Sequence, residues 1–174
     1  LAIESSCDDT AAAVLQGNRV LSNCVANQEI HKQYGGVVPE LASREHQSNI
    51  VPVIHQALRQ ANIEKKQIGA IAYTQGPGLL GSLLVGGSFA KSLAMAWQIP
   101  LLEIDHMQGH LLVHFIKEVH QNPPKFPFIG VTLSGGHTQL IWVEDYFKMT
   151  VLGTTLDDAI GEAFDKCGKH LGLL

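Results

Sequence analysis

The stretch FIGVTLSGGHTQLIWV, residues 128–143, places a short polar turn between two runs of alternating apolar residues. This pattern is typical of two β-strands joined by a hairpin. A related stretch lies 128 positions earlier, where the turn SSCDDT (residues 5–10) corresponds to LSGGHT (residues 133–138). Both copies have the form strand, S-x-x-x-T turn, strand, which indicates an internal duplication.

The order of the expected elements supports this duplication. Strands are predicted at residues 1–4, 11–16, 19–26, 70–75 and 100–104, and helices at residues 39–61, 78–97 and 106–119. After the proline-rich segment NPPKFP come three more predicted strands and a helix, so the series starts again. The sequence therefore predicts an α/β protein of duplicated βββαβαβα domains, the first complete (residues 1–125) and the second truncated (residues 126–174).

Composition limits the classes of function. With 45% hydrophobic and 16% charged residues, the 174-residue chain can bury a globular core. A net charge of -4 provides no global attraction for nucleic acid, so such a partner needs a local patch or another subunit. The chain has no long apolar run, and its three cysteines lie far apart, which predicts a cytoplasmic protein with reduced thiols and no membrane contact. A start without Met inside a strand and a stop at a helix end suggest a fragment.

The two polar turns carry the first candidate residues. In SGGHT, Gly135 and Gly136 would let backbone N–H groups approach an anion, as in phosphate-binding nests. The alternative is a hairpin in which glycine supplies a positive φ. In SSCDDT, Asp8 and Asp9 suit a phosphate-bound Mg²⁺ or the orientation of a nucleophile, with a solvated turn as the alternative.

The segment DHMQGHLLVHF, residues 105–115, carries three histidines at four-residue intervals. Asp105 and the glutamine three residues later form a capping box, so a helix is predicted to begin at His106. His106 and His110 would share one helix face, close enough to bind one metal ion, although such pairs are also common as surface histidines. His114 lies too far along the axis to join both. Met107 stands where a zinc peptidase carries its catalytic Glu.

Two helices leave alternatives open. The last helix is expected to have Thr155 as N-cap and a core stripe of apolar residues, namely Ile160, Ala163, Phe164, Cys167 and Leu171. Its acidic residues, Asp158, Glu162 and Asp165, form either a solvated face or a set of acceptors for ribose hydroxyls. The helix at residues 78–97 has many small residues, which indicates close packing on its own sheet or a subunit interface.

Six motifs resemble, in order and spacing, one known family. They are IESSCDDT, YGGVVPELASREH, YTQGPGLLGSLLVG, DHMQGHLL, LSGGHTQL and DDAIGEAFDKCGK. Together they span the chain and are similar to the bacterial tRNA N6-adenosine threonylcarbamoyltransferases, formerly called glycoproteases or O-sialoglycoprotein endopeptidases. The resemblance implies an actin-like ATPase (ASKHA, RNase H-like) fold. It also implies transfer of a threonylcarbamoyl group from threonylcarbamoyl-AMP to N6 of adenosine 37 in tRNAs that read ANN codons.

The resemblance also implies roles for the motif residues. His106 and His110 correspond to ligands of one divalent iron or zinc ion, and Asp8 and Asp9 to acidic residues near the reaction centre, with Mg²⁺ accompanying the nucleotide as a further candidate. The residues that correspond to adenylate and nucleoside contacts are Thr132, Leu133, Ser134, Gly135, Gly136 and Asp165. The implied partners are tRNA, an inactive paralogous subunit of similar fold and a small P-loop ATPase.

The family's third metal ligand, an Asp, and further nucleoside contacts have no counterpart in this sequence, so the chain is expected to be inactive alone. Archaeal and eukaryotic relatives have a metal-binding Tyr at the position of Thr132 and Asn at that of His137, so the bacterial form is the one resembled. Two other functions stay open at this point. They are the metallo-endopeptidase of the older family name and a scaffold that binds partners without catalysis.

Overall fold

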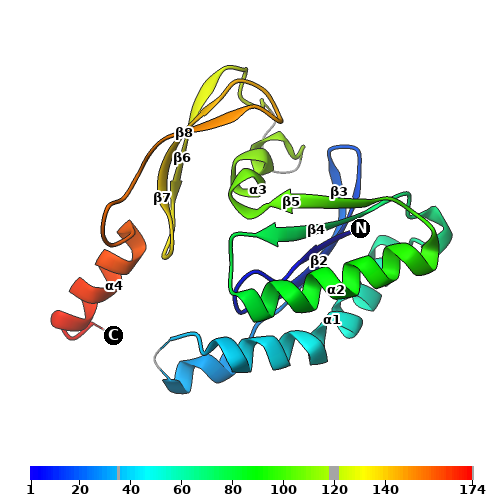
Figure 1. Ribbon diagram of the computed structural model, residues 1–174, viewed down its shortest axis with the longest axis horizontal. Coiled ribbons are helices and arrows are strands. Elements are labelled where there is room, and N and C mark those ends of the chain that lie inside the picture. Colours follow the sequence, from blue (N-terminus) through cyan, green and yellow to red (C-terminus); the bar gives the residue numbers. More distant parts are fainter. Residues whose placement is uncertain (35, 118–121, 174) are drawn as a thin grey trace. The chain divides into compact units, whose positions relative to one another are not determined.

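The computed structural model describes residues 1–34, 36–117 and 122–173 (Figure 1). They form two compact units. The first contains Leu1–Gly109 with Ile116 and Lys117, and the second contains His110–Phe115 and residues 122–173. The expected domain boundary at residues 125 and 126 stays a prediction.

The first unit is built on a five-stranded sheet. Its strands are β1 (Ala2–Glu4), β2 (Thr10–Gln16), β3 (Arg19–Ala26), β4 (Ile71–Gly76) and β5 (Leu101–Asp105). They lie in the order β3-β2-β1-β4-β5, antiparallel from β3 to β1 and parallel from β1 to β5. All five strands lie within one residue of their predicted bounds, because short apolar runs between turn residues mark them in the sequence.

Two long helices, α1 (Pro39–Ala61) and α2 (Leu80–Trp97), cover the same face of this sheet (Figure 1). The strand register places Cys24, Ala12, Ile3 and Tyr73 in one row across four strands, and all four are buried. Side chains two apart on a strand share a face, so this row and its neighbours form the core under the helices. Two short 3-10 helices, η1 (Glu29–Tyr34) and η2 (Lys65–Gln67), complete the connections.

The small residues of α2 pack against its own unit. Ser82, Gly86, Gly87, Ala90 and Ala94 are its buried residues. A Cβ added at Gly87 would lie 3.2 Å from the ring of Tyr73, so glycine permits the helix to approach the sheet closely. The prediction of an internal contact is therefore confirmed for this side of α2, while the outer side stays a candidate interface.

The second unit contains an antiparallel meander and a helix. Its elements are β6 (Phe128–Leu133), β7 (Thr138–Val143), β8 (Met149–Thr154) and α4 (Ile160–His170), with the strands in the order β6-β7-β8. In the first unit Ile3 pairs with Ala12, and in the second Val131 pairs with Leu140, at positions 128 residues higher. The two first hairpins thus share one register, which confirms the duplicated α/β fold.

Helix α3 (His106–Leu112) is shorter than the predicted helix of residues 106–119 and continues as a 3-10 turn, η3 (Val113–Phe115). The expected end near residue 119 lies outside the described residues. Phe115 stacks on Phe126 with ring centroids 5.1 Å apart, and Leu111 is buried beside Ile141. These contacts with the meander favour the tighter turn over a continued α-helix.

Two expectations for α4 are wrong. The helix begins at Ile160, whose N–H donates to the hydroxyl of Thr138 at 2.9 Å, and its N-cap residue is Ala159 rather than Thr155. Thr155 instead donates its hydroxyl to the carbonyl of Asp158. The predicted core stripe is not buried either, since Phe164 is 71% exposed and no residue of α4 is buried. Among the described residues, nothing covers its apolar side.

No helix in the described part of the chain combines the length and apolarity needed to cross a membrane.

Candidate functional site

The start of α2 forms hydrogen bonds with the turn SSCDDT. The N–H of Leu79 donates to the carbonyl oxygen of Ser6 at 2.7 Å, and the hydroxyl of Ser82 donates to that of Cys7 at 2.9 Å. The Ser5 hydroxyl returns a hydrogen bond to the carbonyl of Ser82. A Cβ at Gly78 would lie 2.8 Å from Ser6 Cβ, so this glycine allows the close approach. The small residues at the start of α2 therefore pack within their own unit, which was one of the two alternatives for this helix.

Helix α1 holds the same turn through a buried histidine. His46 has 0% exposure, and its Nε2 donates to the carbonyl oxygen of Cys7 at 3.0 Å. Since a carbonyl only accepts, Nε2 carries the proton, and Nδ1 accepts the hydroxyl of buried Thr10 at 2.7 Å. Both ring nitrogens are thus satisfied inside the core, and the turn is fixed from two helices.

The acidic pair lies on this rigid turn. Asp9 is exposed and Asp8 is half-buried. Partial burial and the neighbouring charge of Asp8 raise the pKa of Asp9 above its ordinary value. Burial and Asp8 together raise the pKa of the Cys7 thiol to about 11, so this cysteine is protonated and unreactive at neutral pH. The pair can accept a proton, orient an amine or bind a hard cation.

His106 begins α3 and contacts two residues of the first strand and its turn. Asp105 caps the helix, since its carboxylate accepts the N–H of Gln108 at 2.9 Å, as predicted. The Nδ1 of His106 lies 3.4 Å from Glu4 Oε2 and 3.3 Å from Ser6 Oγ. The hydrogen bond and charge of Glu4 raise the pKa of His106 against the opposing effect of burial.

His110 lies one turn later on the same helix and is exposed. It lines a cavity of about 350 Å³ together with His114, Gly130 and other residues of the second unit. In the described part of the chain, no three His, Cys, Asp or Glu side chains form a group that could hold a metal ion. Two imidazoles, one of them hydrogen-bonded to a carboxylate, are nevertheless donors that suit iron or zinc. Met107 is 7% exposed and provides no carboxylate for peptidase chemistry.

The SGG turn of the second unit is closed by its flanking residues. The N–H of Ser134 donates to the carbonyl of His137 at 2.9 Å, and the N–H of His137 donates to Ser134 Oγ at 2.9 Å. Neither Gly135 nor Gly136 has a positive φ, and a Cβ at either would meet nothing within 4 Å. The hairpin therefore does not need glycine for its conformation. The bare backbone instead favours close approach by a ligand.

Helix α4 begins against this turn. The N–H of Gly161 donates to the carbonyl of Ser134 at 3.1 Å. One turn later, Asp165 is exposed. Lys166 lies 2.6 Å from Asp158 and 3.1 Å from Glu162, so these two carboxylates form solvated ion pairs. Of the three acidic residues, Asp165 is the best candidate for a ligand contact.

The remaining predicted substrate residues point to opposite sides of β6. Leu133 is 60% exposed, whereas Thr132 is 8% exposed. The hydroxyl of Thr132 is buried without a hydrogen-bond partner among the described residues. A contact of Thr132 with an adenylate would therefore use its backbone rather than its hydroxyl.

The predicted residues fall into two groups, one per unit. The first unit contains the acidic turn and His106, and the second contains His110, the SGG turn and Asp165. Sequence reasoning missed Glu4, His46 and Gly161, which support these groups. The sequence signals were a carboxylate at the end of an apolar strand for Glu4 and a glycine inside a helix for Gly161, whereas His46 lies among polar residues and carries no such signal.

A protein-family model and curated proteins both match this chain. The family model described as TsaD, tRNA N6-adenosine threonylcarbamoyltransferase, matches residues 19–174. The curated tRNA N6-adenosine threonylcarbamoyltransferase of Christiangramia forsetii is 69% identical over 173 residues, which are 99% of this chain and 51% of that protein. The protein of the same name from Riemerella anatipestifer is 62% identical with the same coverage. The chain spans about half the length of the curated relatives it matches.

Two solved structures share the fold. The structure titled YeaZ from Pseudomonas aeruginosa has a TM-score of 0.54 at 16% identity, covering 87% of this chain and 62% of that one. A Pseudomonas aeruginosa protein described as similar to peptidase YEAZ gives 0.55 at 18% identity with the same coverage. These likenesses support the α/β architecture, and the family model with the curated relatives goes further. By these matches, the chain belongs to the tRNA N6-adenosine threonylcarbamoyltransferase family.

Proposed function

We propose that this chain takes part in transferring a threonylcarbamoyl group from threonylcarbamoyl-AMP to N6 of adenosine 37 in tRNAs that read ANN codons. The observation that carries the proposal is the family match over residues 19–174, which includes the SGG turn, the histidine pair and α4. The bare glycines of the turn support it, since their conformation alone does not require glycine. We also propose that the reaction takes place in the cytoplasm, in keeping with tRNA as the proposed substrate.

In this proposal the SGG turn binds the adenylate. The backbone N–H groups of Gly135 and Gly136 face the phosphate, where they stabilise negative charge on the leaving AMP. Asp165 accepts hydrogen bonds from the nucleoside hydroxyls. Thr132 and Leu133 contribute backbone contacts from the end of β6.

His106 and His110 would hold one divalent iron or zinc ion, because neutral imidazoles are suitable ligands for both. A bound ion would supply Lewis acidity for the transfer. The attacking N6 amine forms a bond to the carbamoyl carbon, the bond from that carbon to the phosphate oxygen breaks, and AMP leaves. The amine proton passes to a carboxylate, and Asp9 is suited to accept it because its pKa is raised. Asp8 orients the amine or binds Mg²⁺ accompanying the nucleotide.

A chimera tests this proposal on the residues of this chain. Residues 1–173 would replace the matching half of the Christiangramia forsetii relative, in a strain depleted of its own transferase, and threonylcarbamoyladenosine would be measured by mass spectrometry of tRNA nucleosides. We expect the chimera to restore the modification and the 174-residue chain alone to be inactive, since it supplies only two metal ligands.

Substitutions in the chimera then separate catalysis from scaffolding. His106→Ala and His110→Ala should abolish the modified nucleoside, and His114→Ala, on the same segment, should retain it. Full modification by both single variants would contradict the metal assignment. Full modification by an Asp8→Ala, Asp9→Ala double variant would contradict the role of the acidic pair.

We further propose that a paralogous subunit of similar fold docks on the outer side of α1 and α2. A groove of about 650 Å³ runs between these helices. Leu84 and Val51 line it and are 58% and 56% exposed, an unusual exposure for aliphatic residues on two packed helices. A small P-loop ATPase is proposed as a further partner from the family resemblance.

A further inference from the structure

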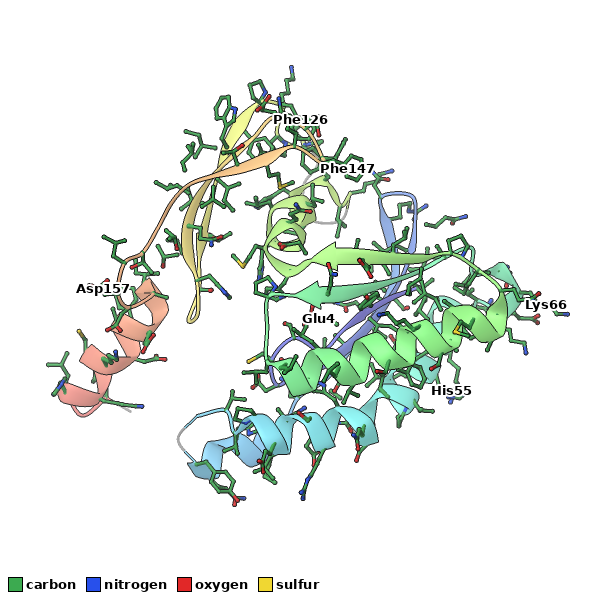
Figure 2. The ribbon with its side chains drawn as sticks, viewed as in Figure 1. Glu4, His55, Lys66, Phe126, Phe147 and Asp157 are labelled. Carbon is green, nitrogen blue, oxygen red and sulfur yellow. The ribbon has the colours of Figure 1, made fainter. Side chains whose placement is uncertain are left out.

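Glu4 is the residue around which three donors of the first unit gather. It ends β1, and its carboxylate accepts the hydroxyl of Thr74 on β4 and the N–H of Ser6 in the following turn. The third neighbour is His106, whose Nδ1 lies 3.4 Å from Glu4 Oε2. Figure 2 labels Glu4 in the first unit.

The sheet register explains this arrangement. Ile3 pairs with Tyr73 in parallel, so the next residues, Glu4 and Thr74, are neighbours. Because successive side chains on a strand alternate, Glu4 and Thr74 point away from the face on which buried Ile3 and Tyr73 pack under α1 and α2. A carboxylate is thus built into the sheet beside the start of α3.

The carboxylate of Glu4 acts as an acceptor in this setting. Its side chain is 35% exposed. Two of its neighbours, the hydroxyl of Thr74 and the N–H of Ser6, donate hydrogen bonds to it. A carboxylate only accepts hydrogen bonds, so the Nδ1 of His106 that faces it carries the proton.

We infer that Glu4 is a positioning residue that fixes His106 as the Nδ1–H tautomer and thereby assigns Nε2 to the metal ion. This inference rests on the proposed metal role of His106. Metal-binding histidines commonly donate their other ring N–H to a carboxylate, which fixes the orientation of the ring and increases its basicity. Ser6 Oγ, 3.3 Å from the same Nδ1, is a second acceptor for this proton.

Nitrogen-15 NMR of the histidine rings tests the inference on the 174-residue chain without metal. At alkaline pH, where the imidazole is neutral, the long-range proton–nitrogen spectrum distinguishes the two tautomers, and His106→Asn assigns the signals. We expect Nδ1–H in the unmodified chain and a substantial Nε2–H population in Glu4→Gln. Glu103→Gln is the matched control, since Glu103 on β5 accepts the hydroxyl of Tyr73 at 3.0 Å and not His106. It should leave the His106 tautomer unchanged.

The same spectra recorded with added Zn²⁺ test the second half of the inference. We expect Zn²⁺ to shift the Nε2 signal of His106, and Glu4→Gln to weaken the apparent affinity by about 10- to 100-fold. Glu103→Gln should bind Zn²⁺ as the unmodified chain does.

Each other result has a distinct meaning. An Nε2–H ring in the unmodified chain, or an unchanged tautomer in Glu4→Gln, overturns the inference and leaves the proposed function intact. The expected tautomers without any response of His106 to Zn²⁺ overturn the metal role of His106 in the proposed function, and with it the positioning role of Glu4. Equal loss of Zn²⁺ affinity in the Glu4 and Glu103 variants would show that removal of any nearby negative charge weakens binding, and would also overturn the inference.

Discussion

The backbone N–H of Gly161 lies 3.1 Å from the carbonyl oxygen of Ser134, so helix α4 begins directly against the SGG turn. A Cβ at Gly161 would lie 2.8 Å from the backbone N and Cα of Gly135, closer than real Cβ contacts. These neighbours are backbone atoms, which cannot rotate away as a flexible side chain does. The position of Asp165 relative to the turn thus depends on the absence of a side chain at residue 161.

Gly161→Ala should therefore displace the turn or the start of α4. We expect a loss of about 1–3 kcal/mol in the free energy of unfolding, the usual cost of overpacking, and changed amide NMR shifts from Ser134 to Thr138. Urea unfolding followed by circular dichroism measures the first effect. Gly153→Ala is the control, because a Cβ there meets nothing within 4 Å. Equal effects of the two substitutions would show that the close contact is not what makes Gly161 necessary.

His46→Ala should destabilise the first unit by about 2–5 kcal/mol, through the cavity it leaves and the buried Thr10 hydroxyl that loses its acceptor. His55→Ala on the same helix is the control, since His55 is exposed, and should change stability by less than about 0.5 kcal/mol. Urea unfolding of both variants makes the comparison. A double-mutant cycle with Thr10→Val then measures the pair directly, and additive losses would refute the coupling between His46 and Thr10.

The contact between Glu4 and His106 predicts a pH window of stability. Because the pKa of Glu4 is lowered in the folded state, its ionised carboxylate stabilises the fold at pH values above the ordinary pKa of 4.5. This contribution to the free energy of unfolding is lost as the pH falls toward about 2. Because the pKa of His106 is raised in the folded state, its protonated ring stabilises the fold at pH values below the ordinary pKa of 6.5. This contribution is lost as the pH rises through the pKa of the folded state. Both pKa shifts arise from the same contact between Glu4 and His106, so its free energy is counted once. After allowance for solvent screening of the partly exposed pair, we expect about 1 kcal/mol.

Urea unfolding with a chelator present, at a series of pH values, measures this window. The difference in unfolding free energy between the unmodified chain and Glu4→Gln should be largest between about pH 4.5 and pH 6.5 and should fall on both sides. A difference that does not vary with pH would mean that Glu4 stabilises the fold without interacting with the charge of His106.

Leu84→Glu should weaken binding of the paralogous subunit by at least about tenfold, because it places a charge in the apolar groove between α1 and α2. The stability of the chain itself should change little, since Leu84 is already 58% exposed. Met95→Glu is the control on the same helix, because Met95 is 79% exposed and does not line the groove. Sedimentation velocity of the mixed proteins measures the effect, and equal weakening by both variants would argue against docking in the groove.

The elements that were predicted well have strong local patterns. Strands β2 and β4 of the first unit show alternating burial. Helix α1 runs from Pro39 to Ala61 as predicted, because a proline at the first position and regularly spaced apolar residues define it locally. The histidine pair and its cap at Asp105 also depend only on residues within one turn. Local spacing is sufficient for such features, since a helix fixes the neighbours at three and four positions.

The start of α4 shows where local patterns fail. The T-x-x-D spacing at Thr155 indicates an N-cap, yet the helix begins five residues later, where the hydroxyl of Thr138 accepts the N–H of Ile160. A side chain 22 residues away thus replaces the local cap, and only the meander brings it there. The apolar stripe of α4 was predicted as core for the same reason, because periodicity shows that one side of a helix is apolar and does not show what covers it.

The sequence by itself determined the duplicated architecture, the two polar turns and the spacing of His106 and His110, since each follows from neighbouring residues or from a repeat of fixed offset. Only the tertiary structure placed Glu4 beside His106, His46 beneath Cys7 and Gly161 against Ser134. These pairs are 102, 39 and 27 residues apart. Strand register and helix packing bring them together, and contacts over such separations leave no periodic pattern in the chain.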